Sequence, residues 1–342
     1  MRRQTTIAGG LESKPALRKS YPIAALILVL ALAFASTAAF AEPKENSGSR
    51  EFEVGLIGDF PYDALQEEQA ANLFEELDSE KLAFITHDGD IKSGSSACTE
   101  DVYQREFRRF EASDNPLVYT PGDNEWTDCH RLPNPTPEEA DPLNRLALLR
   151  SMFFSDGNSL GEKEIPLQRQ SAEYPENARW SRDGVTFATL HLVGSNNNRP
   201  TTLPDGTTIG NKTEYRARNA ANIAWMRKTF DAAKAKDSPG VMLVMQANIF
   251  EEDTATPSGF ADFKAALEEE VTAFDGPVVL VHGDSHTFRI DKPVISETRP
   301  PNFTRVETFG SPDVHWVRAT VDPRDEGVFS FEPEIVEENV TP

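Results

Sequence analysis

Apolar and polar positions recur along the chain with two periods, and together they predict a layered α/β protein. Short apolar runs rich in β-branched residues indicate strands, and apolar residues spaced three and four apart indicate helices. Strands are expected at 52–57, 82–86, 117–121, 185–193, 241–245, 278–281, 305–309, 314–321 and 327–331, and helices at 64–77, 101–113, 143–154, 219–235 and 260–274. Because the two types alternate and only strands follow residue 304, the pattern favours two sheets sandwiched between helices.

The length of 342 residues is enough for one elaborate α/β domain, which is expected over residues 51–331. A flexible leader is expected at 42–50 and an acidic tail at 332–342. The long polar stretches 131–139 and 196–212 are expected to be loops that wall a site.

The first 41 residues have the pattern of a secretory signal peptide. A basic region precedes an apolar run from Ile23 to Ala41, which ends in Ala39-Phe40-Ala41. Cleavage after Ala41 would give an exported protein, periplasmic or secreted. The alternative is an uncleaved membrane anchor, since the run is nearly long enough to span a bilayer.

The charge balance excludes some classes of partner. The chain has a formal net charge of −22, and removal of residues 1–41 would leave 29 basic and 55 acidic residues, a net charge of −26. Such a surface argues against a nucleic-acid groove and against an anionic membrane as the main partner. Bound divalent cations would offset part of this charge.

The chain contains two cysteines, Cys98 and Cys129. In an exported protein they are expected to pair. Such a disulfide would tie together two loops that each follow an acidic motif. The rival interpretation, a cysteine metal ligand, is weaker because no second cysteine lies near either one.

Four acidic segments follow predicted strands and contain the candidate metal-binding and catalytic residues. They read Gly58-Asp59-Phe60-Pro61-Tyr62, Asp88-Gly89-Asp90, Gly122-Asp123-Asn124-Glu125 and His282-Gly283-Asp284-Ser285-His286. Ligands in α/β proteins bind beyond the carboxyl ends of strands, where these carboxylates can converge. Clustered carboxylates need protons or cations for neutralisation, so the segments predict a metal site. Ordinary turn chemistry is the alternative for any one copy.

In order and strand context, these motifs resemble those of the calcineurin-like metallophosphoesterase superfamily, from Phe52 to His286. That superfamily has an α/β/β/α sandwich fold around a two-metal centre. Its motifs are Asp-x-His, Gly-Asp, Gly-Asn-His-Asp/Glu, a lone His after a strand, and Gly-His-x-His. This sequence departs from them at Pro61, Asp123, Asn124, Gln246 and Asp284, where the motifs have His, Asn, His, His and His.

The resemblance implies two divalent cations that share Asp90. One would contact Asp59, Asp90 and His286, with Tyr62 as a further candidate ligand. The other would have only oxygen ligands, from Asp90, Asp123, Gln246 and Asp284. Oxygen ligands favour hard cations, so Mn²⁺, Mg²⁺ or Ca²⁺ is expected in preference to iron or Zn²⁺.

The activity implied by the resemblance is hydrolysis of small phosphomonoesters or phosphodiesters by a metal-activated water. Asp90, His286 and Asn124 would be the catalytic residues. Asn124 would hydrogen-bond a phosphoryl oxygen but cannot protonate a leaving group. Esters with acidic leaving groups should therefore react faster, unless another acid serves.

Three histidines, His87, His130 and His282, are candidates for that acid, and a structural role is the alternative for each. Arg216 and Arg218, placed just before the helix predicted at 219–235, would hold a substrate phosphate or simply be solvated. The segment 191–197 would either face a ligand or leave its strand in a plain turn.

Two other functions stay open. Loss of several motif histidines favours a protein that keeps the fold but acts as a metal- or ligand-binding module. A hydrolase of another type of ester is the second alternative, because a fold does not fix its substrate.

Overall fold

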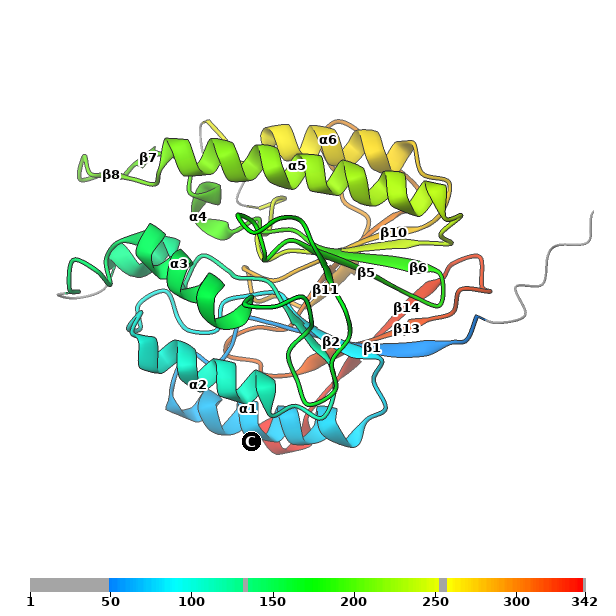
Figure 1. Ribbon diagram of the computed structural model, residues 1–342, viewed down its shortest axis with the longest axis horizontal. Helices are drawn as coiled ribbons and strands as arrows, with labels where there is room; N and C mark the ends of the chain where they lie inside the picture. The colour runs from blue at the N-terminus through cyan, green and yellow to red at the C-terminus, as the bar shows by residue number, and fades with distance from the viewer. Residues whose placement is uncertain (1–48, 132–134, 252–256, 341–342) are drawn as a thin grey trace, which may run out of the picture. The chain divides into compact units, whose positions relative to one another are not determined.

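The computed structural model describes residues 49–131, 135–251 and 257–340 (Figure 1). The predicted signal peptide at 1–41 and most of the predicted leader at 42–50 lie outside the described residues. In the part that is described, no helix combines the length and apolarity needed to cross a membrane.

Two sheets form the centre of the domain. The first has five strands in the spatial order β14 (Phe329–Glu334), β13 (Trp316–Val321), β1 (Phe52–Ile57), β2 (Phe84–His87) and β3 (Leu117–Tyr119). The second has seven, in the order β11 (Arg289–Asp291), β12 (Phe303–Glu307), β10 (Val278–His282), β9 (Val241–Val244), β6 (Val185–Thr189), β5 (Ala178–Arg182) and β4 (Gln168–Arg169). Strands β1, β2 and β3 run parallel, as do β6, β9, β10 and β12.

Helices cover the outer face of each sheet (Figure 1). Helices α1 (Ala64–Ser79), α2 (Glu100–Glu111) and α3 (Pro142–Phe153) pack on the first sheet, and α5 (Lys212–Ala235) and α6 (Ala261–Thr272) pack on the second. The predicted α/β/β/α sandwich is therefore confirmed.

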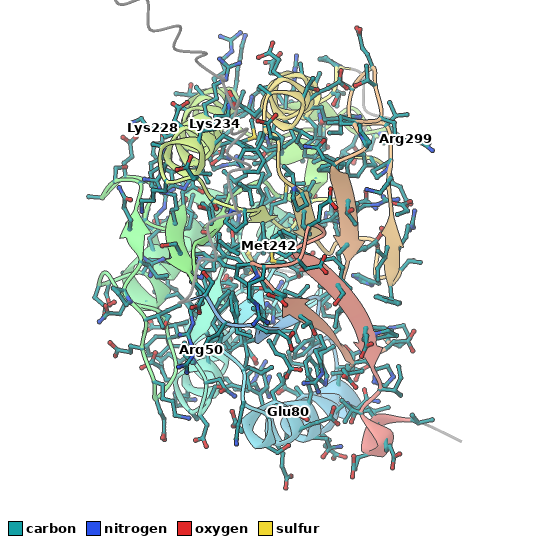
Figure 2. The ribbon with its side chains drawn as sticks, turned by 90° about the vertical axis from the view of Figure 1, so that its right-hand side faces the viewer. Arg50, Glu80, Lys228, Lys234, Met242 and Arg299 are labelled. Carbon is teal, nitrogen blue, oxygen red and sulfur yellow. A yellow bond between two sulfur atoms is a disulfide. The ribbon has the colours of Figure 1, made fainter. Side chains whose placement is uncertain are left out.

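The alternation of side chains along β9 shows how the layers are held together. Val241 and Leu243 belong to the apolar cluster under α5 and α6, whereas Met242 and Val244 belong to the cluster between the two sheets. Met242 accordingly lies near the middle of the layers in Figure 2. A central strand buried on both faces reads as a continuous apolar run, and this is why it was predictable.

The first turn of α5 corrects one prediction. The helix begins at Lys212, seven residues before the predicted start at 219, because Asn211 caps it by accepting hydrogen bonds from the N–H groups of Thr213 and Glu214. Arg216 and Arg218 therefore lie within the helix and not before it.

Short elements were missed within the predicted loops. The stretch 196–212 contains a hairpin of β7 (Thr201–Thr202) and β8 (Thr208–Ile209), preceded by the turn α4 (Gly194–Asn197). The short 3-10 helix η1 (Thr127–Arg131) ends at the first residue of the stretch 131–139. Such short pieces carry too few residues to show a period.

The acidic tail predicted at 332–342 starts too early, because its first residues belong to a strand. Strand β14 continues to Glu334, and the 3-10 helix η2 (Glu337–Asn339) follows it. Val336 is buried, and Asn339 donates to Gln69 O and Val314 O. These contacts anchor η2 against α1 and the segment that precedes β13.

Candidate metal centre

The predicted acidic residues meet at one edge, where strands of both sheets end. Asp59 follows β1, Asp90 follows β2, Asp123 follows β3, and Asp284 follows β10. One carboxylate oxygen from each of Asp90, Asp123 and Asp284 lies within 4.8 Å of the other two. We call these three residues the carboxylate triad.

The glycines of the Gly-Asp motifs are explained by close approach of these carboxylates. A Cβ atom at Gly122 would lie 2.0 Å from Asp90 Oδ1, and one at Gly283 would lie 1.8 Å from Asp59 Oδ2. A side chain at either position would collide with a carboxyl group that follows another strand. Each glycine thus makes room for the acid of another motif.

The backbone is left-handed at four of the site residues. Asp59, Asp90, Asp284 and His286 have φ of 58°, 57°, 79° and 58°. Asp tolerates this region better than most residues, but each such position still costs roughly 1–2 kcal/mol. Strained backbone of this kind clusters at functional sites.

A second group, the tyrosine–histidine group, lies beside the triad and shares Asp90 with it. Tyr62 Oη is 3.2 Å from Asp90 Oδ2 and 3.2 Å from His286 Nε2, and His286 Nε2 is 3.6 Å from Asp59 Oδ1. Asp59 is buried, and both its carboxylate oxygens accept from Asp284 N–H. The structure thus brings together Asp59, Asp90, Tyr62 and His286.

Burial and mutual repulsion shape the electrostatics of the site. Burial, followed by the negative charge of Asp123, raises the pKa of Asp90 well above its ordinary value. Burial, followed by the charge of Asp88, does the same to the pKa of Asp59. Burial and the nearby Asp90 raise the pKa of the Tyr62 phenol, so this group stays a neutral hydrogen-bond donor.

Asn124 already uses its side-chain N–H groups. Its Nδ2 donates to Asp90 Oδ2 at 2.7 Å and to Tyr62 Oη at 3.1 Å, and its backbone N–H donates to Asp90 Oδ1. In this arrangement Asn124 orients Asp90, and contact with a phosphoryl oxygen would require one of these bonds to open.

Gln246 lies at the triad, but its amide is turned the opposite way from the expectation. Its Oε1 accepts from Gly194 N–H at 2.7 Å, and its Nε2 faces the three carboxylates. An amide N–H₂ group is a donor and not a metal ligand. Gln246 is therefore not placed to supply the oxygen ligand expected of it.

The turn from Gly194 to Asn198 overlaps the segment 191–197, for which a ligand-facing loop and a plain turn were both left open, and it brings Ser195 to the site. Ser195, Asn196, Asn197 and Asn198 have φ between 50° and 58°, a run of four left-handed residues. Ser195 Oγ lies 2.8 Å from Asp123 Oδ2 and 2.7 Å from Asp128 Oδ1. The Asn-rich composition was the one available signal, because Asn tolerates this backbone best.

Asp128 and Arg131 complete this side of the site. Arg131 donates to Ser195 Oγ at 2.9 Å and pairs with Asp128 at 2.5 Å, and its side chain is 48% exposed. Burial, then the neighbouring Asp123, raises the pKa of Asp128 to about 8. Arg131 thus presents a half-exposed cation at the mouth of an otherwise acidic site.

Two of the three candidate acids are not available to a substrate. His87 and His282 are completely buried, and burial lowers the pKa of each to about 3. His87 is packed against the rings of Phe60 and Phe110. His130 is half-buried and hydrogen-bonds Thr127 O through Nδ1.

The two arginines of α5 have different environments. Arg216 is exposed, and it lines a surface hollow with Arg199, Lys212 and Tyr215. In the part of the chain described, Arg216 makes no hydrogen bond or ion pair with the metal-centre residues. Arg218 is buried and holds the left-handed turn through hydrogen bonds to Asn197.

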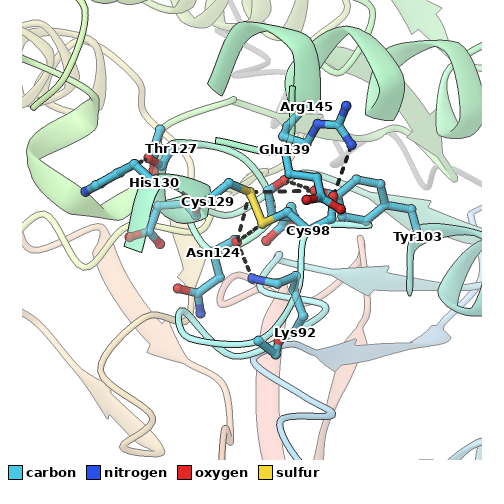
Figure 3. Close-up of a disulfide and its surroundings, with 12 residues drawn as sticks. Lys92, Cys98, Tyr103, Asn124, Thr127, Cys129, His130, Glu139 and Arg145 are labelled. Carbon is cyan, nitrogen blue, oxygen red and sulfur yellow. Dashed lines mark hydrogen bonds between the residues drawn. A yellow bond between two sulfur atoms is a disulfide. The ribbon is translucent and has the colours of Figure 1, made fainter. Parts of the chain in front are cut away.

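The predicted disulfide between Cys98 and Cys129 is present, with Cα atoms 5.8 Å apart (Figure 3). It lies beside Asn124, whose carbonyl oxygen accepts from the buried Lys92 Nζ at 2.6 Å. The disulfide and Lys92 together fix the loop that presents Asn124 to Asp90.

The side chains of the two groups show whether each could bind one of the two expected cations. The tyrosine–histidine group offers two buried carboxylates, a phenol and an imidazole, a set that suits a divalent cation. The triad has the oxygens for a hard cation, but the N–H₂ group of Gln246 lies among them. The first group has suitable ligand types, and in the second the amide of Gln246 competes with a cation for the carboxylate oxygens.

No family model matches this sequence, and no curated protein matches it either. Among solved structures, the chain is similar to a dimetal phosphatase from Danio rerio (13% identity, TM-score 0.49, 83% of this chain and 96% of that one). It is also similar to GAP50, the anchor in the inner membrane complex of Plasmodium (10%, 0.44, 84% and 89%), and to purple acid phosphatase PPD1 of yellow lupin (14%, 0.44, 85% and 55%). At these identities and TM-scores, the activity of the chain has to be inferred from its own residues.

Proposed function

We propose that this protein is an exported, metal-dependent phosphoesterase. The observation that carries the proposal is the convergence of acidic strand ends from both sheets, which gathers Asp59 and the carboxylate triad around Asp90. Several buried carboxylates with raised pKa values require a cation or protons in their midst.

Asp59, Asp90, Tyr62 and His286 are the residues proposed to hold the cation. A bound divalent cation would neutralise the carboxylates and polarise a phosphoryl oxygen. Asn124 and Tyr62 both donate to Asp90 Oδ2 and so hold this carboxylate in place. His286 has a side chain that is 28% exposed, so this half of the site is open to solvent and substrate.

Arg131 is proposed to recognise the substrate. Its guanidinium is half-exposed beside Ser195, and a phosphate oxygen is the ligand that such a group pairs with best. The long-range field of an acidic chain repels anions, so a cation at the mouth favours phosphoesters that come close. This role replaces the one expected for Arg216.

Leaving groups with low pKa values should be preferred. Asn124 cannot give up a proton, and His87 and His282 are buried as neutral rings. Aryl phosphates, which need little protonation on departure, should therefore react faster than alkyl phosphates.

A second candidate function is binding without turnover. It is favoured by the amide groups of Asn124 and Gln246, which both donate to Asp90 and so satisfy that buried carboxylate with neutral groups. Such a protein would bind a cation or an anionic ligand and release no product.

The disulfide supports export, because disulfides persist in oxidising compartments. Fractionation of cells followed by amino-terminal sequencing tests this part of the proposal. Mature protein that begins at Glu42 and lies outside the cytoplasm is the expected result, and an uncleaved cytoplasmic chain would contradict it.

Activity is tested with p-nitrophenyl phosphate and bis-p-nitrophenyl phosphate. The metal-stripped full chain receives Mn²⁺, Mg²⁺, Ca²⁺ and Zn²⁺ singly, and Asp90→Asn is compared with Asp231→Asn, which removes an exposed carboxylate on α5. We expect a metal to restore turnover in the wild type and in Asp231→Asn but not in Asp90→Asn. Absence of turnover with every metal, in folded protein that still binds a cation, would favour the second candidate function.

A further inference from the structure

The side chain of Gln246 lies in the middle of the carboxylate triad. Its Nε2 is 3.3 Å from Asp90 Oδ2, 3.0 Å from Asp123 Oδ1 and 3.1 Å from Asp284 Oδ1. The whole residue is buried. Two N–H hydrogens thus serve three carboxylate oxygens.

The direction of the amide is fixed at both ends. Gly194 N–H lies 2.7 Å from Oε1, and a backbone N–H can pair only with an acceptor. The carboxylate oxygens at the other end can pair only with a donor. Turning the amide over would lose all four hydrogen bonds and set its oxygen against three anionic groups, which is strongly unfavourable.

The amide nitrogen and a cation compete for the same space. A hard cation lies about 2.0–2.6 Å from each oxygen ligand. The triad oxygens lie within 4.8 Å of one another, and the nitrogen stands 3.0–3.3 Å from each of the three. A cation bound by all three oxygens would therefore be driven against Nε2.

We propose that Gln246 replaces a second cation, so that this chain binds a single divalent cation in the group formed by Asp59, Asp90, Tyr62 and His286. This inference rests on the proposed function, since it assumes that a cation is bound at all. It differs from the two-cation centre expected from the motifs. The physical reason is that position 246 has a glutamine whose N–H₂ group donates to the carboxylates, where the motif has a metal-binding histidine.

The neighbouring group is made of a phenol, an imidazole and two carboxylates, which are side chains that bind divalent cations. Tyr62 Oη lies 3.2 Å from Asp90 Oδ2 and 3.2 Å from His286 Nε2, and His286 Nε2 lies 3.6 Å from Asp59 Oδ1. The amide of Asn124 borders this group and donates to two of its four members, Tyr62 Oη and Asp90 Oδ2.

The experiment counts the cations. The full chain is stripped of metal, dialysed against Mn²⁺ and analysed for bound manganese per chain, with electron paramagnetic resonance as a second readout. The wild type should bind one ion and give the six-line spectrum of isolated Mn²⁺. Gln246→Glu exchanges the donor for a carboxylate and should bind two. The control Gln69→Glu, which adds a carboxylate at a buried site on α1, should still bind one.

Two further variants locate the ion. His286→Ala should lose it, whereas Asp284→Asn should keep it; the reverse pattern overturns the inference. Two ions in the wild type with an exchange-coupled spectrum also overturn it, as does a folded Gln246→Glu protein that still binds one. No ion in the wild type contradicts the proposed metal-dependent function itself, so the two failures are distinguishable.

Discussion

Arg218 is the buried cation on which the left-handed turn depends, and its removal gives a sharp test of the energetics. All five of its N–H groups are used: Nε and Nη2 donate to the carboxylate of Glu214, Nη1 donates to His191 O and Asn197 Oδ1, and Nη2 also donates to Asn197 O. The guanidinium also stacks on Trp126, 5.2 Å from the ring centroid.

The substitution Arg218→Met keeps an unbranched apolar stem and removes every one of these bonds. Glu214 is only 12% exposed, so it would be left as a charge without its partner. Removing one member of a buried ion pair costs about 3–5 kcal/mol. This is a large part of the free energy of unfolding of a typical domain, roughly 5–15 kcal/mol.

The cost should depend on pH in a defined direction. Burial alone would raise the pKa of Glu214, but Arg218 holds this pKa below its ordinary value. A depressed carboxylate pKa contributes stability above the unfolded-state pKa, and this contribution is lost as pH falls through the folded-state value. Without Arg218 the contribution is absent, so the difference between wild type and variant should shrink at acid pH.

Urea denaturation at pH 7 and pH 4 measures both effects. The control is Arg216→Met, an exposed neighbour on the same helix, which should change the free energy of unfolding by less than about 0.5 kcal/mol. A loss below 1 kcal/mol for Arg218→Met, or a loss that does not depend on pH, would refute the reasoning.

Three other predictions concern substrate binding, pH and the disulfide. Arg131→Ala should raise KM for aryl phosphates about tenfold with little change in kcat, and an unchanged KM would remove Arg131 from the substrate site. Burial, followed by the charge of Arg109, lowers the pKa of His87 to about 3 in the folded protein. In the unfolded chain this histidine has its ordinary pKa of about 6.5, so it binds a proton there and destabilises the fold as pH drops below that value. Between pH 7 and pH 5 the wild type should lose about 2 kcal/mol more than His87→Phe, and equal losses would contradict this account. Replacing Cys98 and Cys129 by serine should cost about 3–4 kcal/mol, because the bridge closes a loop with a sequence separation of 31; a smaller loss than 1 kcal/mol in urea would argue against a constraint on the unfolded chain.

The strands and the convergence of the acidic residues at their ends were predictable from the same short segments, each an apolar run followed by Gly-Asp. A strand such as β9 is buried on both faces and reads as an unbroken apolar run, and the Gly-Asp at a strand end marks the edge where the chain turns. The close approaches at Gly122 and Gly283 show why glycine precedes the acid in these motifs.

The direction of the Gln246 amide was not predictable, because it depends on the N–H of Gly194, 52 residues away in sequence. A sequence shows that an oxygen is present in the side chain and not which way it faces. Likewise, Arg131 joins the site by donating a hydrogen bond to Ser195 Oγ. Arg218 lies within α5, which begins seven residues before its predicted start. Such pairings arise from tertiary contacts that periodicity does not record.

The most direct test of the proposed metal-dependent hydrolysis is a titration that measures the rate and the bound metal in one sample. Metal-stripped full chain receives increasing Mn²⁺, and phosphoester hydrolysis is recorded together with the ions bound per chain. The account predicts no rate without metal and a rate that rises in proportion to bound manganese, levelling off at one ion per chain. A rate that is absent at full occupancy, or that is present without bound metal, would contradict it.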